Sequence, residues 1–277
     1  MTLRRFETSG PGGETARPAR VTFLGTGTSH GVPMIGCSCA TCRSSDPRDR
    51  RLRPSIYLDV DRRTRILVDT STDLRQQALA HGITRVDAVL YTHAHADHVL
   101  GLDELRRFNV LQNAPIPCYA DARTWEALKR TFFYVFDGMA RPGGGIPQLE
   151  PREIAGPFEI DGIGIVPVRV LHGRTPVLGF RFGAFAYLTD CSAIPDESWA
   201  LVQGVDTLVI DALRDRPHPT HFTVAEALAA VERIAPRRAY FTHMCHDLPH
   251  AATCARLPRG VELAYDGLVL DVDVGRA

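Results

Sequence analysis

The sequence has few of the features that mark a secreted, membrane-bound or polyanion-binding protein. No apolar run approaches the roughly 20 residues of a membrane-spanning helix, and the polar residues 1–20 contain no apolar stretch typical of a secretory signal. Lysine is nearly absent, Lys129 being the only one, and the formal net charge is zero. This balance gives no argument for a membrane or a polymeric nucleic acid as a partner.

The composition is typical of one large globular domain. The chain has 277 residues, of which 44% are hydrophobic, enough to build a sizeable core. It contains no low-complexity linker and no short internal repeat. We therefore expect a flexible N-terminal tail at residues 1–20 and a single domain at residues 21–277.

The seven cysteines are an odd number, and three of them, Cys37, Cys39 and Cys42, lie within six residues. Such crowding suits metal binding in a reducing compartment better than a disulfide framework. We therefore expect a cytoplasmic protein.

Strand-like apolar runs alternate with helical patterns in both halves of the chain. Strands are expected at residues 21–24, 55–60, 65–68, 86–91, 164–170, 177–182, 184–188, 207–210, 238–241, 261–264 and 268–272. Helices are expected at residues 72–81, 121–130, 195–203 and 223–234. Thr72 and Asp121 are the expected N-caps of the first two helices, and the last two strands are expected to form a hairpin over Asp266 and Gly267. Groups of strands interleaved with helices predict two sheets packed between helices.

Three imidazoles and one carboxylate are concentrated in residues 92–98, which read THAHADH. The apolar run 86–91 predicts a buried strand, so these residues lie on the loop at its C-terminal end. There His93, His95, Asp97 and His98 can converge on one point, as a divalent cation requires. One ion cannot use all four and keep a position open for substrate. The spacing therefore predicts two adjacent metals, with further ligands from elsewhere.

Three residues of the second half follow apolar runs in the same way. They are His172, Asp190 and His243, and each stands just beyond a predicted strand. Their residue types are those that bind divalent cations, so they are the expected further ligands.

The pattern His-x-His-x-Asp-His, with a distant His, a distant Asp and a final His, resembles the signature of the metallo-β-lactamase-fold hydrolases. The resemblance covers nearly all of residues 21–272. It implies an α/β fold, an αββα sandwich of two mixed β-sheets flanked by helices, with a dinuclear site at the sheet edges. The ligands that it implies are His93, His95 and His172 for one metal, Asp97, His98 and His243 for the other, and Asp190 as the bridge between them.

Two neighbouring positions refine this assignment. Asp69, which ends the apolar run 66–68, matches the early Asp that orients the ligand loop in this fold. Cys191 stands next to Asp190, and a misalignment by one residue would exchange their roles. The apolar run that ends in Thr189 and Asp190 favours Asp190 as the bridging residue.

Residues 25–33, 218–223 and 242–248 together are similar to the PhnP-like phosphodiesterases, a group named for an enzyme that opens a ribosyl cyclic phosphate. This similarity implies a separate structural zinc. Its ligands would be Cys37, Cys39, Cys42 and His246, the last lying three residues beyond His243. Four such ligands close a tetrahedral shell, so the site would stabilise rather than catalyse. It would pin the loop 26–54 against the loop that carries His243.

The activity implied by the resemblance is metal-dependent hydrolysis of small cyclic phosphates or nucleotide-like phosphodiesters. Two divalent metals, zinc or manganese, would generate a bridging hydroxide. His221 is the candidate that protonates the leaving oxygen or stabilises the transition state, with His218 as its rival in the same segment. Asp97 is counted with His221 in the catalytic set. The resemblance also implies a homodimer.

Two other classes of function remain as alternatives. The first is another hydrolase of the same fold: a glyoxalase-type thioesterase, a tRNA-processing nuclease or a lactamase. A nuclease should carry a long basic arm, and residues 123–130 are too short and too weakly charged for that. The second is a non-catalytic metal-binding protein, and the intact set of seven ligands argues against it.

Overall fold

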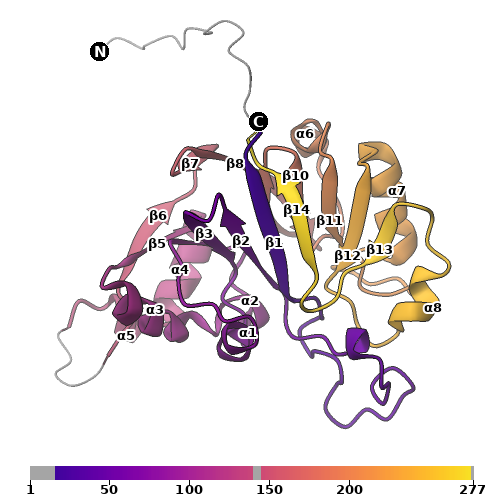
Figure 1. Cartoon of the computed structure of the whole chain (residues 1–277), viewed down its shortest axis with the longest axis horizontal. Coiled ribbons are helices and arrows are strands. Elements are labelled where there is room, and N and C mark those ends of the chain that lie inside the picture. Colours follow the sequence, from indigo (N-terminus) through magenta and orange to yellow (C-terminus); the bar gives the residue numbers. More distant parts are fainter. Residues whose placement is uncertain (1–15, 140–144, 276–277) are drawn as a thin grey trace, which may run out of the picture.

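Two seven-stranded β-sheets lie face to face, with helices packed on the outer side of each sheet (Figure 1). The computed structural model describes residues 16–139 and 145–275. This four-layer arrangement confirms the predicted αββα sandwich of two mixed sheets flanked by helices.

The first sheet has the strand order β14-β1-β2-β3-β4-β5-β6. Its strands are β1 (Pro18–Gly25), β2 (Ser55–Val60), β3 (Thr64–Val68), β4 (Ala88–Leu90), β5 (Ile116–Ala120), β6 (Leu149–Glu153) and β14 (Val269–Asp273). The pairs from β14 to β3 are antiparallel, and those from β3 to β6 are parallel. The helices on this side are α1 (Leu74–Ala80), α2 (Ala96–Val99), α3 (Leu105–Gln112), α4 (Ala122–Thr131) and α5 (Phe133–Phe136).

The second sheet has the order β13-β12-β11-β10-β9-β8-β7. Its strands are β7 (Phe158–Ile160), β8 (Ile163–His172), β9 (Thr175–Phe182), β10 (Phe185–Leu188), β11 (Thr207–Asp211), β12 (Arg238–Thr242) and β13 (Val261–Leu263). The pairs from β13 to β10 are parallel and those from β10 to β7 antiparallel. The helices on this side are α6 (Asp196–Trp199), α7 (Val224–Ile234) and α8 (His250–Cys254). Short 3-10 helices lie at Pro47–Asp49, Leu102–Glu104 and Ala200–Val202.

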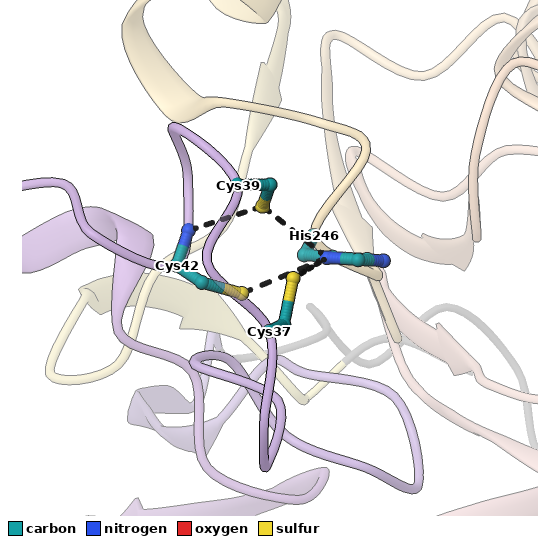
Figure 2. A group of neighbouring side chains, drawn as sticks. All are labelled: Cys37, Cys39, Cys42 and His246. Atoms are coloured by element: carbon teal, nitrogen blue, oxygen red, sulfur yellow. Dashed lines mark hydrogen bonds between the residues drawn. The ribbon is translucent and has the colours of Figure 1, made fainter.

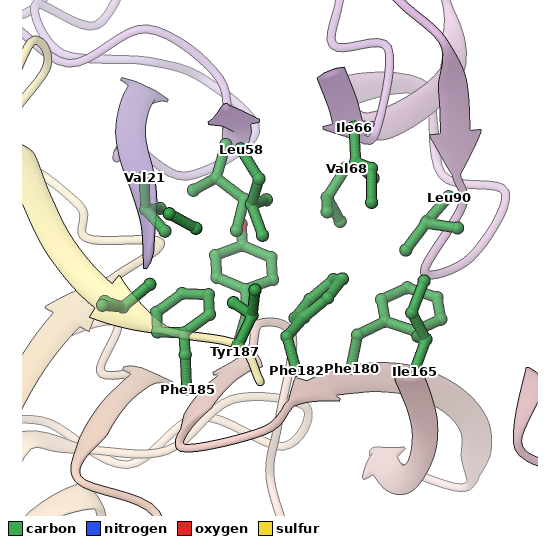
Figure 3. Close-up of a cluster of buried hydrophobic side chains, with 14 of the residues drawn as sticks. Val21, Leu58, Ile66, Val68, Leu90, Ile165, Phe180, Phe182, Phe185 and Tyr187 are labelled. Carbon is green, nitrogen blue, oxygen red and sulfur yellow. The ribbon is translucent and has the colours of Figure 1, made fainter. Parts of the chain in front are cut away.

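The main core lies between the two sheets (Figure 3). Alternate residues of a strand point to opposite faces, so aliphatic side chains such as Leu58 and Val68 of the first sheet point inward. They meet aromatic rings of the second sheet, including Phe180, Phe182 and Phe185. These five side chains are fully buried. The interface therefore joins the two sheets into one unit.

The ends of strands from both sheets meet at one edge of the sandwich. Asp69 follows β3, Asp190 lies just beyond β10, and His243 follows β12 directly. Their φ angles are 63°, 52° and 59°, in the left-handed region that costs a non-glycine residue about 1–2 kcal/mol. Each strand thus ends in a sharp turn, and the chain accepts this strain at the three positions where a ligand-type side chain must turn toward the edge.

The structure differs from the sequence-based expectations at a few elements. The predicted hairpin at the C-terminal end is wrong, because β13 joins the second sheet and β14 crosses to pair with β1. The side chain of Asp266 holds the crossing by accepting hydrogen bonds from Thr26 Oγ1 and Leu52 N. Thr72 is not the cap of α1, because its hydroxyl donates to Ala96 O instead.

Other expected elements agree with the structure. Asp121 caps α4 by accepting from Thr124 N, and α7 begins with a capping box made by Thr223 and Glu226. Strand β1 starts at Pro18, three residues before the expected start, and most of the proposed tail, residues 1–15, lies outside the described residues. The described ranges contain no helix whose length and apolar character would let it cross a membrane.

Candidate metal centre

The HAHADH residues and the strand ends of the second sheet supply one continuous group of ligand-type side chains. His93 and His95 lie on the loop after β4, whereas Asp97 and His98 belong to α2. Two subsets made of predicted ligands have ligand atoms within 4.8 Å of one another: the first is His93, His95, His172 and Asp190, and the second is Asp97, His98 and His243. A third subset, within the same distance, joins His221 to Asp190 and His243. The structure therefore brings together the seven predicted ligands in the two predicted groups.

Asp190, a member of the first subset, also lies close to two residues of the second. Its Oδ2 is 3.0 Å from His98 Nε2, and its Oδ1 is 3.3 Å from His243 Nε2 and 3.8 Å from His93 Nε2. A carboxylate in this position can bind one cation with each oxygen. Neighbouring Cys191 instead donates its Sγ–H to Ala193 O and its backbone N–H to Asp211, so Cys191 points away from the centre.

The unpaired atoms of the centre fit a bound cation. The Nε2 atoms of His93, His98 and His243 and the Oδ2 of Asp97 are buried, and each lacks a hydrogen-bond partner within the described part of the chain. Leaving a buried polar atom unpaired costs about 1–3 kcal/mol. Divalent cations held by these nitrogen and oxygen atoms would remove that cost.

Hydrogen bonds behind the centre orient the imidazole rings. Asp69 accepts from Thr92 N and Thr92 Oγ1, and its Oδ2 lies 2.7 Å from His98 Nδ1. His93 Nδ1 lies 3.0 Å from Thr92 Oγ1, and His172 Nδ1 lies 2.8 Å from Thr220 O. When Nδ1 carries the proton in each ring, Nε2 presents a lone pair to the centre. Asp69 thus has the orienting role that the sequence predicts for it.

The charges of the centre also favour a cation. Burial would lower the pKa of His98, yet Asp190, Asp97 and Asp69 hold it well above its usual value. The pKa of His172, in contrast, is lowered to about 4 by burial, which leaves its ring neutral. The carboxylates therefore stabilise positive charge beside His98, whereas His172 on the other side of the centre is a neutral nitrogen ligand.

His221 lies against both subsets without being one of the seven ligands. Its ring centroid is 4.6 Å from those of His172 and His243, and it stacks on His243 with an interplanar angle of 15°. Its Nδ1 lies 2.6 Å from Oδ2 of the fully buried Asp211, the last residue of β11. Among the described residues no carboxylate pairs with His218, whose Nδ1 lies close to Thr220 N and Thr220 Oγ1. Of the two histidines in this segment, His221 is therefore the one that contacts predicted ligands and pairs with a carboxylate.

Asp211 was not among the site residues predicted from the sequence, although its position at a strand end could have indicated it. It ends a predicted apolar strand, as Asp69, Asp190 and His243 do. The hydroxyl of Thr92, which links Asp69 to His93, gave no comparable signal, because its role depends on contacts between separate strands.

A second group of ligand-type side chains, separate from the main centre, is formed by three cysteines of the loop 26–54 and by His246. The Sγ atoms of Cys37, Cys39 and Cys42 lie 3.2, 3.3 and 3.6 Å from His246 Nδ1 (Figure 2). A hydrogen bond from Cys42 N lowers the pKa of Cys39 to about 6, which favours the thiolate that metals bind. All four side chains converge, so the group can close a tetrahedral shell around zinc.

The loop of the cysteines is tied to the loop of His243. Met244 N donates to Thr26 O, and Thr28 N donates to Met244 O. The buried Arg51 donates to the carbonyl oxygens of Cys245 and Leu248. The cysteine group and the main centre therefore share one hydrogen-bonded segment, 243–248.

Comparison with known families agrees with this geometry. The profile described as the Beta-lactamase superfamily domain matches residues 64–244, more than half of the chain. The chain belongs to this superfamily. A solved structure described as a new diphosphatase from the PhnP family is 45% identical, with a TM-score of 0.88, over 94% of this chain and 99% of that one. The superfamily member is thus also PhnP-like, as its cysteine and histidine motifs predict.

Two further relatives differ more. An octanoyltransferase of Porphyromonas gingivalis is 38% identical over 256 residues, covering 92% of this chain and 52% of that protein. The chain thus spans about half the length of this relative. Zinc-bound PqqB from Methylobacterium extorquens is 23% identical with a TM-score of 0.71 over 91% of this chain and all of that one, which shows a shared fold.

Proposed function

We propose that this superfamily member is a dinuclear metal-dependent phosphodiesterase that hydrolyses small cyclic phosphates or nucleotide-like phosphodiesters. The observation that carries the proposal is the pairing of His221 with Asp211 beside a centre of seven ligand-type side chains. The similarity to a diphosphatase of the PhnP family supports phosphorus, rather than a lactam or thioester carbonyl, as the reacting atom.

The ligand assignment follows the two subsets. His93, His95 and His172 would hold one divalent cation, Asp97, His98 and His243 the other, and Asp190 would bridge them. When bound, two zinc or manganese ions would lower the pKa of water and withdraw charge from the phosphoryl oxygens. Cys37, Cys39, Cys42 and His246 would hold the structural zinc.

The role of His221 follows from its hydrogen bond. Hydrolysis adds water across one P–O bond, so a new P–O bond forms and the leaving alkoxide must gain a proton. With its Nδ1–H donated to Asp211, His221 directs Nε2 away from this carboxylate and can deliver that proton as a general acid. The carboxylate of Asp211 stabilises the imidazolium before transfer.

A second candidate function is hydrolysis of a phosphoanhydride, favoured by the 45% identity to the diphosphatase. In that reaction the leaving group is itself a phosphate, which needs less help from a proton donor. His221→Ala should therefore slow diester hydrolysis more than anhydride hydrolysis. In the wild-type protein, the ratio of kcat/KM for the diester to kcat/KM for the anhydride identifies the preferred substrate class.

The decisive experiment combines turnover with metal analysis. Metal-loaded protein is expected to cleave bis-p-nitrophenyl phosphate and 2′,3′-cyclic nucleotides, and to bind three metal ions per chain by mass spectrometry. Asp190→Asn should lose turnover and active-site metal, whereas the exposed Asp271→Asn should lose neither. Hydrolysis of a thioester without cleavage of either phosphodiester would contradict the proposal.

We also propose a cytoplasmic location, a homodimer and a small phosphodiester as the partner, as the sequence and its resemblance imply. Light scattering on the full chain tests the oligomeric state, since a dimer has twice the mass of the 30.5 kDa chain.

A further inference from the structure

Three of the ligand-type residues at the main centre directly follow a threonine. The pairs are Thr92 and His93, Thr189 and Asp190, and Thr242 and His243. All three threonines are fully buried. Burying a hydroxyl is unfavourable unless it forms a hydrogen bond, so the partner of each hydroxyl shows what the threonine stabilises.

The hydroxyl of Thr189 contacts Asp190, the proposed bridge between the two cations. Thr189 Oγ1 donates to Asp190 Oδ2 at 2.8 Å, and both side chains are buried. Thr92 Oγ1 donates instead to Asp69, and Thr242 Oγ1 has no partner in the described part of the chain. Of these three threonines, Thr189 is therefore the one that donates to an oxygen of a predicted ligand.

The other close neighbours of the Asp190 carboxylate are ligand nitrogens. Oδ2 lies 3.0 Å from His98 Nε2, and Oδ1 lies 3.3 Å from His243 Nε2 and 3.8 Å from His93 Nε2. An imidazole nitrogen that binds a cation uses its lone pair and has no proton to donate. When the centre is loaded, these rings cannot hold the carboxylate by hydrogen bonds, whereas the hydroxyl of Thr189 still can.

The bond from Thr189 also fixes which way the carboxylate faces. A carboxylate that bridges two cations must keep one oxygen directed to each of them. Because Thr189 holds Oδ2 on the side of His98, Oδ1 stays on the side of His93 and His243. Rotation of the carboxylate group would break the bond to Thr189. Hydrogen-bond partners of this kind typically change metal affinity or activity by about 10–100-fold.

We infer that Thr189 is a positioning residue, whose hydroxyl holds the carboxylate of Asp190 in the orientation that bridges two cations. This inference rests on the proposed dinuclear function and adds to it a determinant of metal affinity outside the seven ligands. Loss of the hydroxyl should weaken binding of the cation pair, and it should leave the zinc of the cysteine group in place.

The test is manganese binding by Thr189→Val, which keeps the branched shape of the side chain and removes the hydroxyl. Protein that retains zinc in the cysteine group but has an emptied main centre is titrated with manganese, and free Mn²⁺ is measured by electron paramagnetic resonance. At least one of the two dissociation constants should rise about 10–100-fold in the variant. Thr189→Ser, which restores a hydroxyl, should bind both ions as tightly as the wild-type protein.

The matched control is Thr207→Val, because Thr207 makes the same kind of contact away from the centre. Thr207 is buried, and its Oγ1 donates to Oδ2 of the preceding residue, Asp206, at 3.1 Å. It begins β11, whereas Asp211, which contacts His221, ends that strand. The control thus loses a comparable hydrogen bond, and its two dissociation constants should equal those of the wild-type protein.

A purely structural role for Thr189 would lower the Tm of Thr189→Val and leave its manganese affinity unchanged. Unchanged dissociation constants would therefore refute the inference, and so would a loss that Thr189→Ser does not reverse. Thr189→Ala, which should show the same weakening, replaces Thr189→Val if that variant does not fold.

The same titration separates the inference from the proposed function. If the wild-type protein binds fewer than two manganese ions, the dinuclear centre is wrong, and the inference with it. If it binds two ions but cleaves neither bis-p-nitrophenyl phosphate nor a 2′,3′-cyclic nucleotide, the proposed hydrolysis is wrong, and the comparison of the Thr189 variants still decides the role of this residue.

Discussion

Asp211→Asn tests whether His221 acts as a proton donor. Asp211 is fully buried, and its Oδ2 lies 2.6 Å from His221 Nδ1 and accepts from Cys191 N. Asparagine keeps the size of the side chain but loses its charge, and its amide can turn an N–H toward His221. A hydrogen bond to a charged group contributes about 1.5–3 kcal/mol. Since about 1.4 kcal/mol corresponds to tenfold in rate, kcat should fall roughly 10- to 150-fold.

The size of this loss should depend on the leaving group. Opening a 2′,3′-cyclic nucleotide releases a sugar alkoxide, which needs a proton, whereas bis-p-nitrophenyl phosphate releases p-nitrophenolate, which needs none. The full loss is expected for the cyclic nucleotide and only a small loss for the nitrophenyl ester. His218→Ala, in the same loop but without a carboxylate partner, is the control and should lower neither rate strongly.

Stopped assays on both substrates, with metal content measured on the same samples, separate the possibilities. An equal loss on both substrates would show that Asp211 supports the metal centre instead of His221. An unchanged rate on the cyclic nucleotide would refute the proton-donor role altogether.

Three further predictions concern the cysteine group, a half-buried carboxyl and the core. Cys39→Ser should lose one zinc per chain by mass spectrometry and lower Tm by about 5 °C or more; unchanged zinc content would exclude the structural site. Burial raises the pKa of Asp266 to about 7, so the folded protein keeps a proton that the unfolded chain releases, and this residue costs stability as pH rises from about 4 to 7. In urea titrations, Asp266→Asn should lack this loss, a relative gain of up to about 4 kcal/mol across that range, and parallel pH profiles would contradict it. Phe182→Ala, in the fully buried core between the sheets, should lower the free energy of unfolding by about 3–5 kcal/mol, and a loss below about 1 kcal/mol would mean that the sheets repack.

The main features of the fold could be predicted from sequence because they follow from local patterns. Apolar alternation in the segment 55–60 and the continuous apolar run 66–68 mark strands whatever they pair with, since the first buries one face and the second buries both. The pairing itself was harder to predict. The C-terminal strand β14 crosses to the first sheet, where it pairs with β1, more than 240 residues away in sequence. Only the packing of the two sheets decides between this pairing and a local hairpin.

In the candidate centre, too, some features could be predicted from the sequence and others depended on the tertiary structure. The sequence by itself determined which residue types stand at strand ends, so His93, His172, Asp190 and His243 could be named from their spacing and chemistry. Their convergence and the hydrogen bond between Asp211 and His221 were decided only by the tertiary structure. The physical reason is that a ligand can be recognised from its own side chain. A charge or an orienting hydrogen bond depends on which distant groups the fold places beside it.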